Sequence, residues 1–154
     1  MRTYFRLIPA AYLFLIQNGE VLLQRRANTG YEDGNWGVPS GHLVGDESAT
    51  MAMVREAREE IGLTVDARYL QLVHMMHRRG TEGGTDKENE RIDLFFVLTQ
   101  WSGVPVNREP EHCDAVAWFP LTSLPDNTIP YIRFALNAYQ SGTLYSERGW
   151  ADSR

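Results

Sequence analysis

The sequence predicts an α/β fold in which a mixed β-sheet is covered by helices on both faces. Runs of β-branched and aromatic residues lie on both sides of one long helical segment, and a second helical segment follows near the end of the chain. The chain has 154 residues, about the length of one domain, and no repeat, low-complexity tract or linker divides it. We therefore expect a single domain over residues 1–154.

The first thirty residues predict a β-hairpin. Residues 12–17 and 20–25 are two β-prone runs, and Asn18 and Gly19 join them. This pair suits a type I′ turn, which needs positive φ at both central positions. Residues 27–37 are rich in turn-forming residues and predict a loop.

The middle of the chain predicts one helix followed by strands. Residues 46–61 form the long helical stretch, with Asp46 or Ser48 as N-cap and Gly62 as the residue that ends it. The segments that follow are expected in this order: one or two strands over 65–78, a polar loop over 79–90, a buried central strand over 91–101, a loop over 102–114 and a short strand over 115–119. A second helix is expected over 129–140, with Asn127 or Thr128 as its cap and Ile132, Ala135, Leu136 and Tyr139 on its buried face.

Composition excludes several classes of function. The 15 Lys and Arg against 20 Asp and Glu give a net charge of −5, which argues against a broad basic surface and hence against nucleic-acid binding. The single Cys113 has no partner for an internal disulfide, so a reducing cytoplasm is the expected compartment. The longest apolar run, around residues 10–16, is too short to span a bilayer, so no membrane partner is expected. The sequence leaves a monomer and a homodimer open.

The long helix carries a cluster of acidic residues. Glu56, Glu59 and Glu60 share one side, because residues three and four apart are neighbours on a helix. Carboxylate oxygens are the ligands that Mg²⁺ and Mn²⁺ prefer, so a divalent ion would offset the repulsion between them. On this cluster alone, a solvated helix face remains the alternative.

Residues 41–63 carry a longer pattern that includes this cluster. Five residues separate Gly41 from Glu47, seven separate Glu47 from the Arg55-Glu56 pair, and Glu59-Glu60 and Gly62 follow at fixed spacing. This pattern resembles the signature of the Nudix hydrolase family, with a MutT-like character. The likeness extends over roughly residues 5–140, leaves out residues 143–154, and implies an α/β/α sandwich.

The resemblance also implies roles for individual residues. The metal, Mg²⁺ or Mn²⁺, would be held by Glu56, Glu59, Glu60 and the backbone carbonyl of Gly41. Arg55 and Glu47 would support catalysis, with Arg55 pairing with carboxylates to fix their orientation. The general base is either Glu56 or Glu109, a choice that the sequence leaves open.

Two arginines are candidates for binding the substrate. Arg25 and Arg26 end the second strand of the predicted hairpin and point to opposite faces. Arginines in this place reach a substrate phosphate or base in MutT-like members, and an exposed strand end is the alternative.

The expected activity is metal-dependent hydrolysis of a diphosphate bond in a small nucleoside phosphate. Family markers for ADP-ribose and dinucleoside polyphosphates are missing from residues 76–80, so a (deoxy)nucleoside triphosphate, cleaved to monophosphate and pyrophosphate, is the expected substrate. Alternatives are ADP-ribose, a nucleotide sugar and a non-catalytic nucleotide-binding module. An isomerase of the isopentenyl diphosphate type is disfavoured, because such enzymes depend on a catalytic cysteine and further metal histidines, and Cys113 lies late in the chain.

Overall fold

The computed structural model describes residues 1–79 and 89–150. A five-stranded mixed sheet has the strand order β5-β1-β7-β6-β9, in which β1 pairs in parallel with β7 and β6 with β9. Its strands are β1 (Ile8–Phe14), β5 (Ser40–His42), β6 (Leu70–Arg79), β7 (Glu90–Leu98) and β9 (Tyr145–Arg148). A second, antiparallel sheet contains β2 (Ile16–Gln17), β3 (Glu20–Arg26), β4 (Trp36–Gly37) and β8 (Cys113–Pro120), with β3 at its centre.

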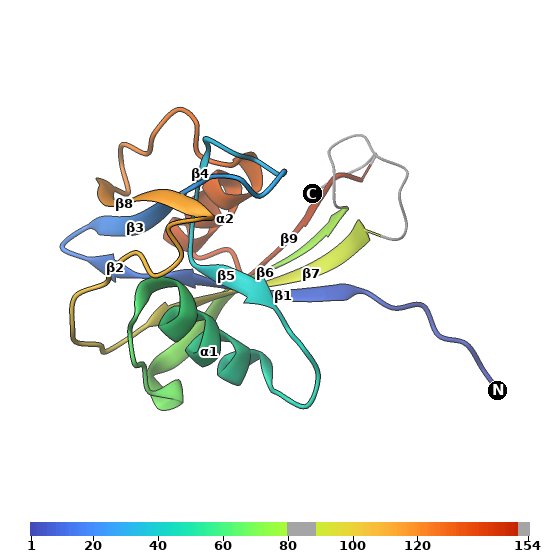
Figure 1. Ribbon diagram of the computed structural model, residues 1–154. Coiled ribbons are helices and arrows are strands. Elements are labelled where there is room, and N and C mark those ends of the chain that lie inside the picture. Colours follow the sequence, from blue (N-terminus) through green and yellow to red (C-terminus); the bar gives the residue numbers. More distant parts are fainter. Residues whose placement is uncertain (80–88, 151–154) are drawn as a thin grey trace.

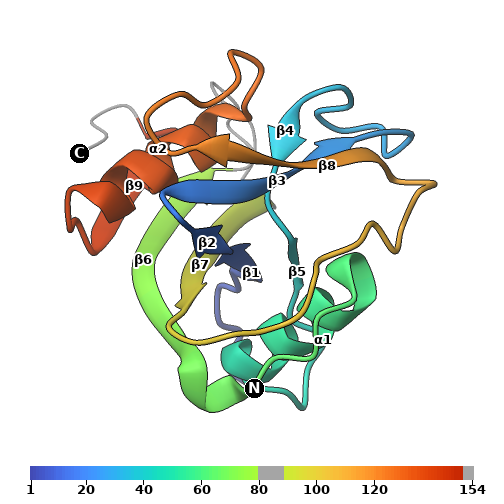
Figure 2. The same ribbon diagram turned by 90° about the vertical axis from the view of Figure 1, so that its left-hand side faces the viewer.

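Two helices cover the sheets from opposite sides, α1 (Ala49–Ile61) and α2 (Pro130–Gln140), so the predicted α/β/α sandwich is confirmed (Figures 1 and 2). The alternation of β1 explains the layers. Ala11 and Leu13 pack in one core cluster with α1, whereas Tyr12 and Phe14 pack in the other cluster with α2. Because β1 is buried on both faces, it is a central strand.

The predicted hairpin is only partly correct. Asn18 and Gly19 do form the turn, with φ of 51° and 75°, as a type I′ turn requires. However, only β2 pairs with β3 across this turn, because residues 8–14 leave the hairpin and insert between β5 and β7. Residues 12–14, which we expected in the hairpin, belong to the apolar run of β1, and this run fits burial on both faces better.

The first helix begins three residues later than expected. Ser48 is its N-cap, since its Oγ accepts a hydrogen bond from the Met51 amide at 3.2 Å, and Asp46 lies before it at a positive φ of 53°. Gly62 ends the helix in the left-handed conformation, as predicted. A short 3-10 turn (Ala67–Tyr69) separates α1 from β6.

The second half of the chain follows the predicted order with small shifts. The central strand β7 lies between β1 and β6, as expected. The helix α2 has Ile129 at its N-cap and Pro130 in its first turn, so neither Asn127 nor Thr128 caps it; they bind the carbonyls of Gly34 and Pro125 instead. Most of the predicted polar loop lies outside the described residues. The strand β9 is not anticipated from the sequence, because its Tyr-Ser-Glu-Arg run has no apolar alternation.

Candidate active site

Arg55 connects the loop before α1 with the acidic side of the helix. Its guanidinium donates two hydrogen bonds to Glu47, at 2.8 and 3.1 Å, and a third to Glu56 Oε1 at 2.7 Å. The hydrogen bonds that Arg55 donates to Glu47 lower the pKa of Glu47. The hydrogen bonds that Arg55 makes with Glu47 and Glu56 also raise the pKa of Arg55. Arg55 therefore holds the Glu56 carboxylate in one orientation, the contact expected from the sequence.

Glu56 lies directly against the backbone of Gly41. Its side chain is only 12% exposed, and a Cβ added to Gly41 would lie 1.9 Å from Glu56 Oε1. The hydrogen atom of glycine therefore leaves the space that the carboxylate fills. Burial raises the pKa of Glu56 against the opposing effect of Arg55, and the charges of Glu59 and Glu109 raise it further.

Glu60 lies one turn further along α1 and lines a cavity between the two sheets. Its Oε2 accepts a hydrogen bond from the backbone amide of Ser40 at 2.8 Å, which ties the helix to β5. Burial raises the pKa of Glu60 well above its usual value, and repulsion from Glu56 and Glu109 adds to the effect. The structure thus brings Glu56, Glu60 and Glu109 into one electrostatic cluster next to Gly41.

The loop between β7 and β8 positions Glu109. The amides of Val106 and Arg108 donate to the carbonyls of Ile61 and Glu60, at 2.9 and 3.0 Å, so the loop satisfies carbonyl groups that the helix end leaves free. The Glu109 amide then donates to Asn107 Oδ1 at 3.0 Å, and the Glu109 carbonyl accepts from two following amides. These bonds explain how a residue far from α1 in sequence lines the same cavity as Glu60.

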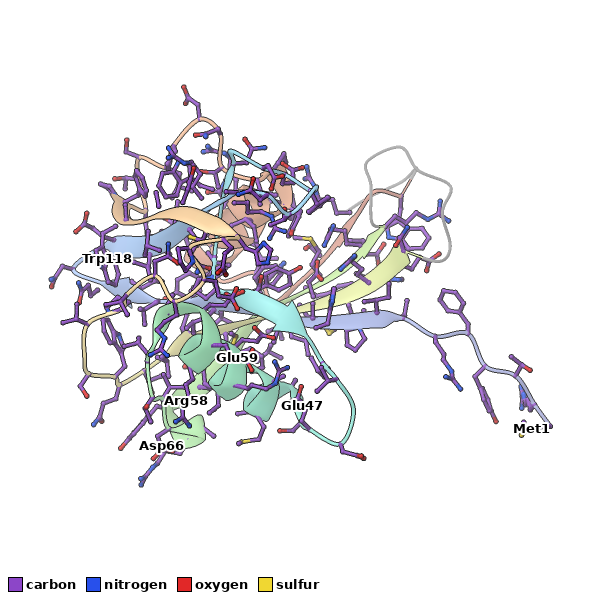
Figure 3. The ribbon with its side chains drawn as sticks, viewed as in Figure 1. Met1, Glu47, Arg58, Glu59, Asp66 and Trp118 are labelled. Atoms are coloured by element: carbon purple, nitrogen blue, oxygen red, sulfur yellow. The ribbon has the colours of Figure 1, made fainter. Side chains whose placement is uncertain are left out.

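Glu59 is the more exposed acidic residue of this side of the helix, although its charge acts on Glu56. Its side chain is 49% exposed, is 3.3 Å from Arg55, and lines a surface pocket together with Arg58 and Arg108. Figure 3 labels Glu59 and Arg58 on α1. It does not line the cavity that Glu60 and Glu109 line. A metal-binding role for Glu59, which the sequence predicts, would need its side chain to turn toward Glu60.

The cavity has a volume of about 600 Å³, within the range of small-molecule sites. Both predicted substrate-binding arginines line it, but each is already engaged. Arg25 forms an ion pair with Asp114 at 2.7 Å and stacks on Trp36, and Arg26 donates to the Tyr31 carbonyl at 2.8 Å.

Several cavity residues are missed by reading the sequence. Arg78 forms an ion pair with Asp93 at 2.7 Å and lies 3.7 Å from the centre of the Tyr131 ring, and Tyr131 in turn meets Tyr12 edge-on. Gln24 is 8% exposed and lines the same space. No motif marks these residues, because their strands pair only in the folded chain.

Cys113 also lines the cavity, although it lies late in the sequence. Its Sγ donates to the carbonyl of Ala115 at 3.2 Å. Burial raises the pKa of the Cys113 thiol, and the negative charge of Glu60 contributes to the shift. The thiol is therefore held in its protonated form, which is a poor nucleophile.

The residue types of the cluster fit a hard divalent cation. Mg²⁺ and Mn²⁺ take oxygen ligands such as carboxylates and backbone carbonyls. Here buried carboxylates that repel one another lie beside the backbone of Gly41. Among residues 1–79 and 89–150, no three acidic, histidine or cysteine side chains already surround one point, and Arg55 bonds to Glu56 instead. The carboxylates would therefore have to turn toward a common ion.

Comparison with known proteins identifies the family. Residues 6–137 match the family model described as the NUDIX domain, so the chain belongs to the Nudix family. It is similar to an isopentenyl-diphosphate Delta-isomerase of Jannaschia sp. (strain CCS1), with 32% identity over 84% of this chain and 77% of the relative. Nudix hydrolase 5 of Arabidopsis thaliana is 27% identical over 70% of this chain and 34% of that protein.

A solved structure supports the fold. The MutT NUDIX hydrolase from Burkholderia pseudomallei superposes with a TM-score of 0.74, at 24% identity over 86% of this chain and 97% of that one. The predicted MutT-like Nudix fold is therefore confirmed. In the described ranges, no helix has the length and apolar character needed to cross a membrane.

Proposed function

We propose that this Nudix protein hydrolyses a diphosphate bond in a small nucleoside phosphate, with a (deoxy)nucleoside triphosphate as the expected substrate. The observation that carries the proposal is an acidic cluster in which Glu60 and Glu109 line a cavity of about 600 Å³ and Glu56 lies against Gly41, another lining residue. A cavity of this size, lined by tyrosines, arginines and the amide of Gln24, is large enough for a nucleoside as well as its phosphates.

The cluster supplies the groups that the reaction needs. A divalent ion held by Gly41, Glu56, Glu59 and Glu60 would stabilise the negative charge of the diphosphate. Glu56 or Glu109 takes a proton from the attacking water, whose oxygen forms a bond to phosphorus while the anhydride P–O bond breaks. Arg55 keeps Glu56 oriented through the 2.7 Å hydrogen bond. Pyrophosphate leaves, and a nucleoside monophosphate remains.

A second candidate is isomerisation of an isopentenyl diphosphate, because the Jannaschia relative carries that name at 32% identity. The sequence argued against an isomerase because Cys113 lies late in the chain. In the fold, however, Cys113 lines the cavity, so this candidate stays open. The raised pKa of Cys113 and the cavity volume of about 600 Å³ favour hydrolysis of a larger substrate.

One assay separates the two candidates. The protein is incubated with Mg²⁺ and a panel of nucleoside triphosphates, ADP-ribose, nucleotide sugars and isopentenyl diphosphate, and the products are separated by chromatography. We expect a nucleoside monophosphate and pyrophosphate from a triphosphate, with little effect of Cys113→Ala on that rate. Conversion of isopentenyl diphosphate to an isomer, lost in Cys113→Ala, would instead establish the isomerase.

The role of Glu109 has its own test. If Glu109 is the general base, Glu109→Gln should lower kcat on the best substrate by about 10²–10⁴ while KM changes little, because base catalysis contributes that range. Glu111→Gln is the matched control, since Glu111 is an exposed neighbour on the same loop. A Glu109→Gln enzyme with the kcat of the Glu111→Gln control would assign the base to Glu56.

A further inference from the structure

One cavity arginine differs from the others in how it is paired. Arg91 lies on β7 and lines the cavity, and the register places it directly opposite Arg78 on β6. Residues directly opposite in a sheet share a face, and like charges there repel each other. Asp93 lies two residues further along β7 on the same face, and it forms its ion pair with Arg78 at 2.7 Å.

This arrangement leaves Arg91 with donors to spare. The hydrogen bond described for Arg91 runs from its Nη1 to Nε2 of His42, at 2.9 Å. Because a guanidinium only donates, Nε2 of His42 must be the unprotonated nitrogen of a neutral imidazole. The Nε of Arg91 is buried and has no hydrogen-bond partner within the described part of the chain.

Two of the other cavity arginines are paired with carboxylates, Arg25 with Asp114 and Arg78 with Asp93. Arg26 donates from its Nε to the neutral carbonyl of Tyr31 and stacks on the Tyr31 ring. The charge of Arg91 also acts on the nearby Asp93 carboxylate, but its hydrogen bond goes to an uncharged ring and its buried Nε has no partner among the described residues. A planar guanidinium with free donors matches two oxygens of a phosphate group.

The location of Arg91 suits this role. His42 directly follows Gly41 in β5, so Arg91 contacts the strand that carries the predicted metal-binding carbonyl. The strands β5, β1 and β7 form this side of the cavity. An anion that lies between Arg91 and the carboxylate cluster would therefore contact the positive charge of Arg91 there.

We propose that Arg91 is a phosphate-binding residue of the cavity and contacts a phosphate group of the substrate's diphosphate. This inference rests on the proposed function for the identity of the substrate. The contact itself would be the same for any substrate that carries a diphosphate group. The unpartnered Nε of Arg91 then supplies a donor for this anion that no sequence motif marks.

The test measures binding without requiring turnover. Inorganic diphosphate is titrated into the protein by calorimetry in the presence of Mg²⁺. We expect Arg91→Gln to weaken diphosphate binding by about 10-fold or more, because a charge-assisted bidentate contact is lost. Arg91→Lys should recover part of the affinity, since it restores the charge without the fork. Arg68→Gln is the matched control, because Arg68 is exposed and paired with Asp66.

Thermal unfolding separates binding from a structural role. Removing Arg91 takes away both its repulsion with Arg78 and its attraction to Asp93, so the Tm of Arg91→Gln should stay close to that of the unsubstituted protein. A lower Tm with unchanged diphosphate affinity would assign Arg91 to the fold and overturn the proposal. Absence of diphosphate binding to the unsubstituted protein at millimolar concentration would overturn it as well.

The same variants keep the two proposals distinguishable. With an active substrate, Arg91→Gln should raise KM more than it lowers kcat. If no nucleotide is hydrolysed but Arg91-dependent diphosphate binding is observed, the inference about Arg91 stands and the proposed hydrolase activity fails.

Discussion

Replacing Glu60 with glutamine should lower the rate of diphosphate hydrolysis by about 10²–10⁴, the range seen when a general base or a positioned charge is lost. The amide keeps the shape of the side chain, and its oxygen can still accept the hydrogen bond from the Ser40 amide. What disappears is one negative charge from the cluster that also contains Glu56 and Glu109. Steady-state kinetics at saturating Mg²⁺ measures the loss.

The stability of this variant should move in the opposite direction. Because burial and neighbouring carboxylates raise the pKa of Glu60 well above its usual value, the ionised form destabilises the folded protein at neutral pH. A neutral glutamine removes this penalty, so Tm should rise while activity falls. Near-unchanged kinetics for Glu60→Gln would contradict the proposed site and leave the motif with a structural role only.

Glu59 gives a comparison on the same helix. Its side chain is half exposed and contacts Arg55, whereas Glu60 lines the cavity. If both carboxylates act on one ion, the double variant Glu59→Gln/Glu60→Gln should cost much less than the sum of the single losses. Additive losses would show that the two side chains act independently.

Removal of divalent metal should abolish activity entirely. Incubation with EDTA is expected to stop turnover, and added Mg²⁺ or Mn²⁺ in excess should restore it, because a buried cluster of carboxylates cannot receive a diphosphate without a compensating cation. Full turnover in chelator, with the metal content checked by elemental analysis, would refute the metal-dependent mechanism.

Metal should also stabilise the folded protein. An ion that binds only the folded state adds about 2.7 kcal/mol at a concentration 100 times its Kd, and Tm should rise accordingly. The same titration on Glu60→Gln should give a smaller shift of Tm. An equal shift in both proteins would place the stabilising ion away from Glu60.

Local patterns in the sequence predicted the parts of the fold that depend on neighbouring residues. The Asn18-Gly19 turn, the Gly62 helix end and the order of strands around α1 follow from turn chemistry and periodicity. The sequence did not predict that β1 separates from the hairpin, because the partners of a strand depend on which other strands bury its two faces. The strand β9 was missed for another reason, since its short polar sequence has no apolar alternation.

The candidate site divides in a similar way. The fixed spacing of residues 41–62 identified Glu56 and Glu60, and the position of Glu109 after the central strand suggested its place beside them. Arg78, Arg91 and Gln24 come from strands whose side chains meet only after pairing, so no spacing in the sequence could reveal them. Glu59 shows the converse, since a motif position need not point into the cavity.

The late strand β9 gives the five-stranded sheet an outer edge. It pairs in parallel with Met75 to Arg78 of β6, and the buried His74 ring contacts the Thr143 carbonyl and Ser146 Oγ, at 2.7 and 2.8 Å. A chain shortened after α2 would therefore leave a long strand with unpaired backbone groups and a buried imidazole without its partners. Such an edge is a template for strand addition by another molecule. The final segment thus replaces the longer edge of β6 with the shorter edge of β9.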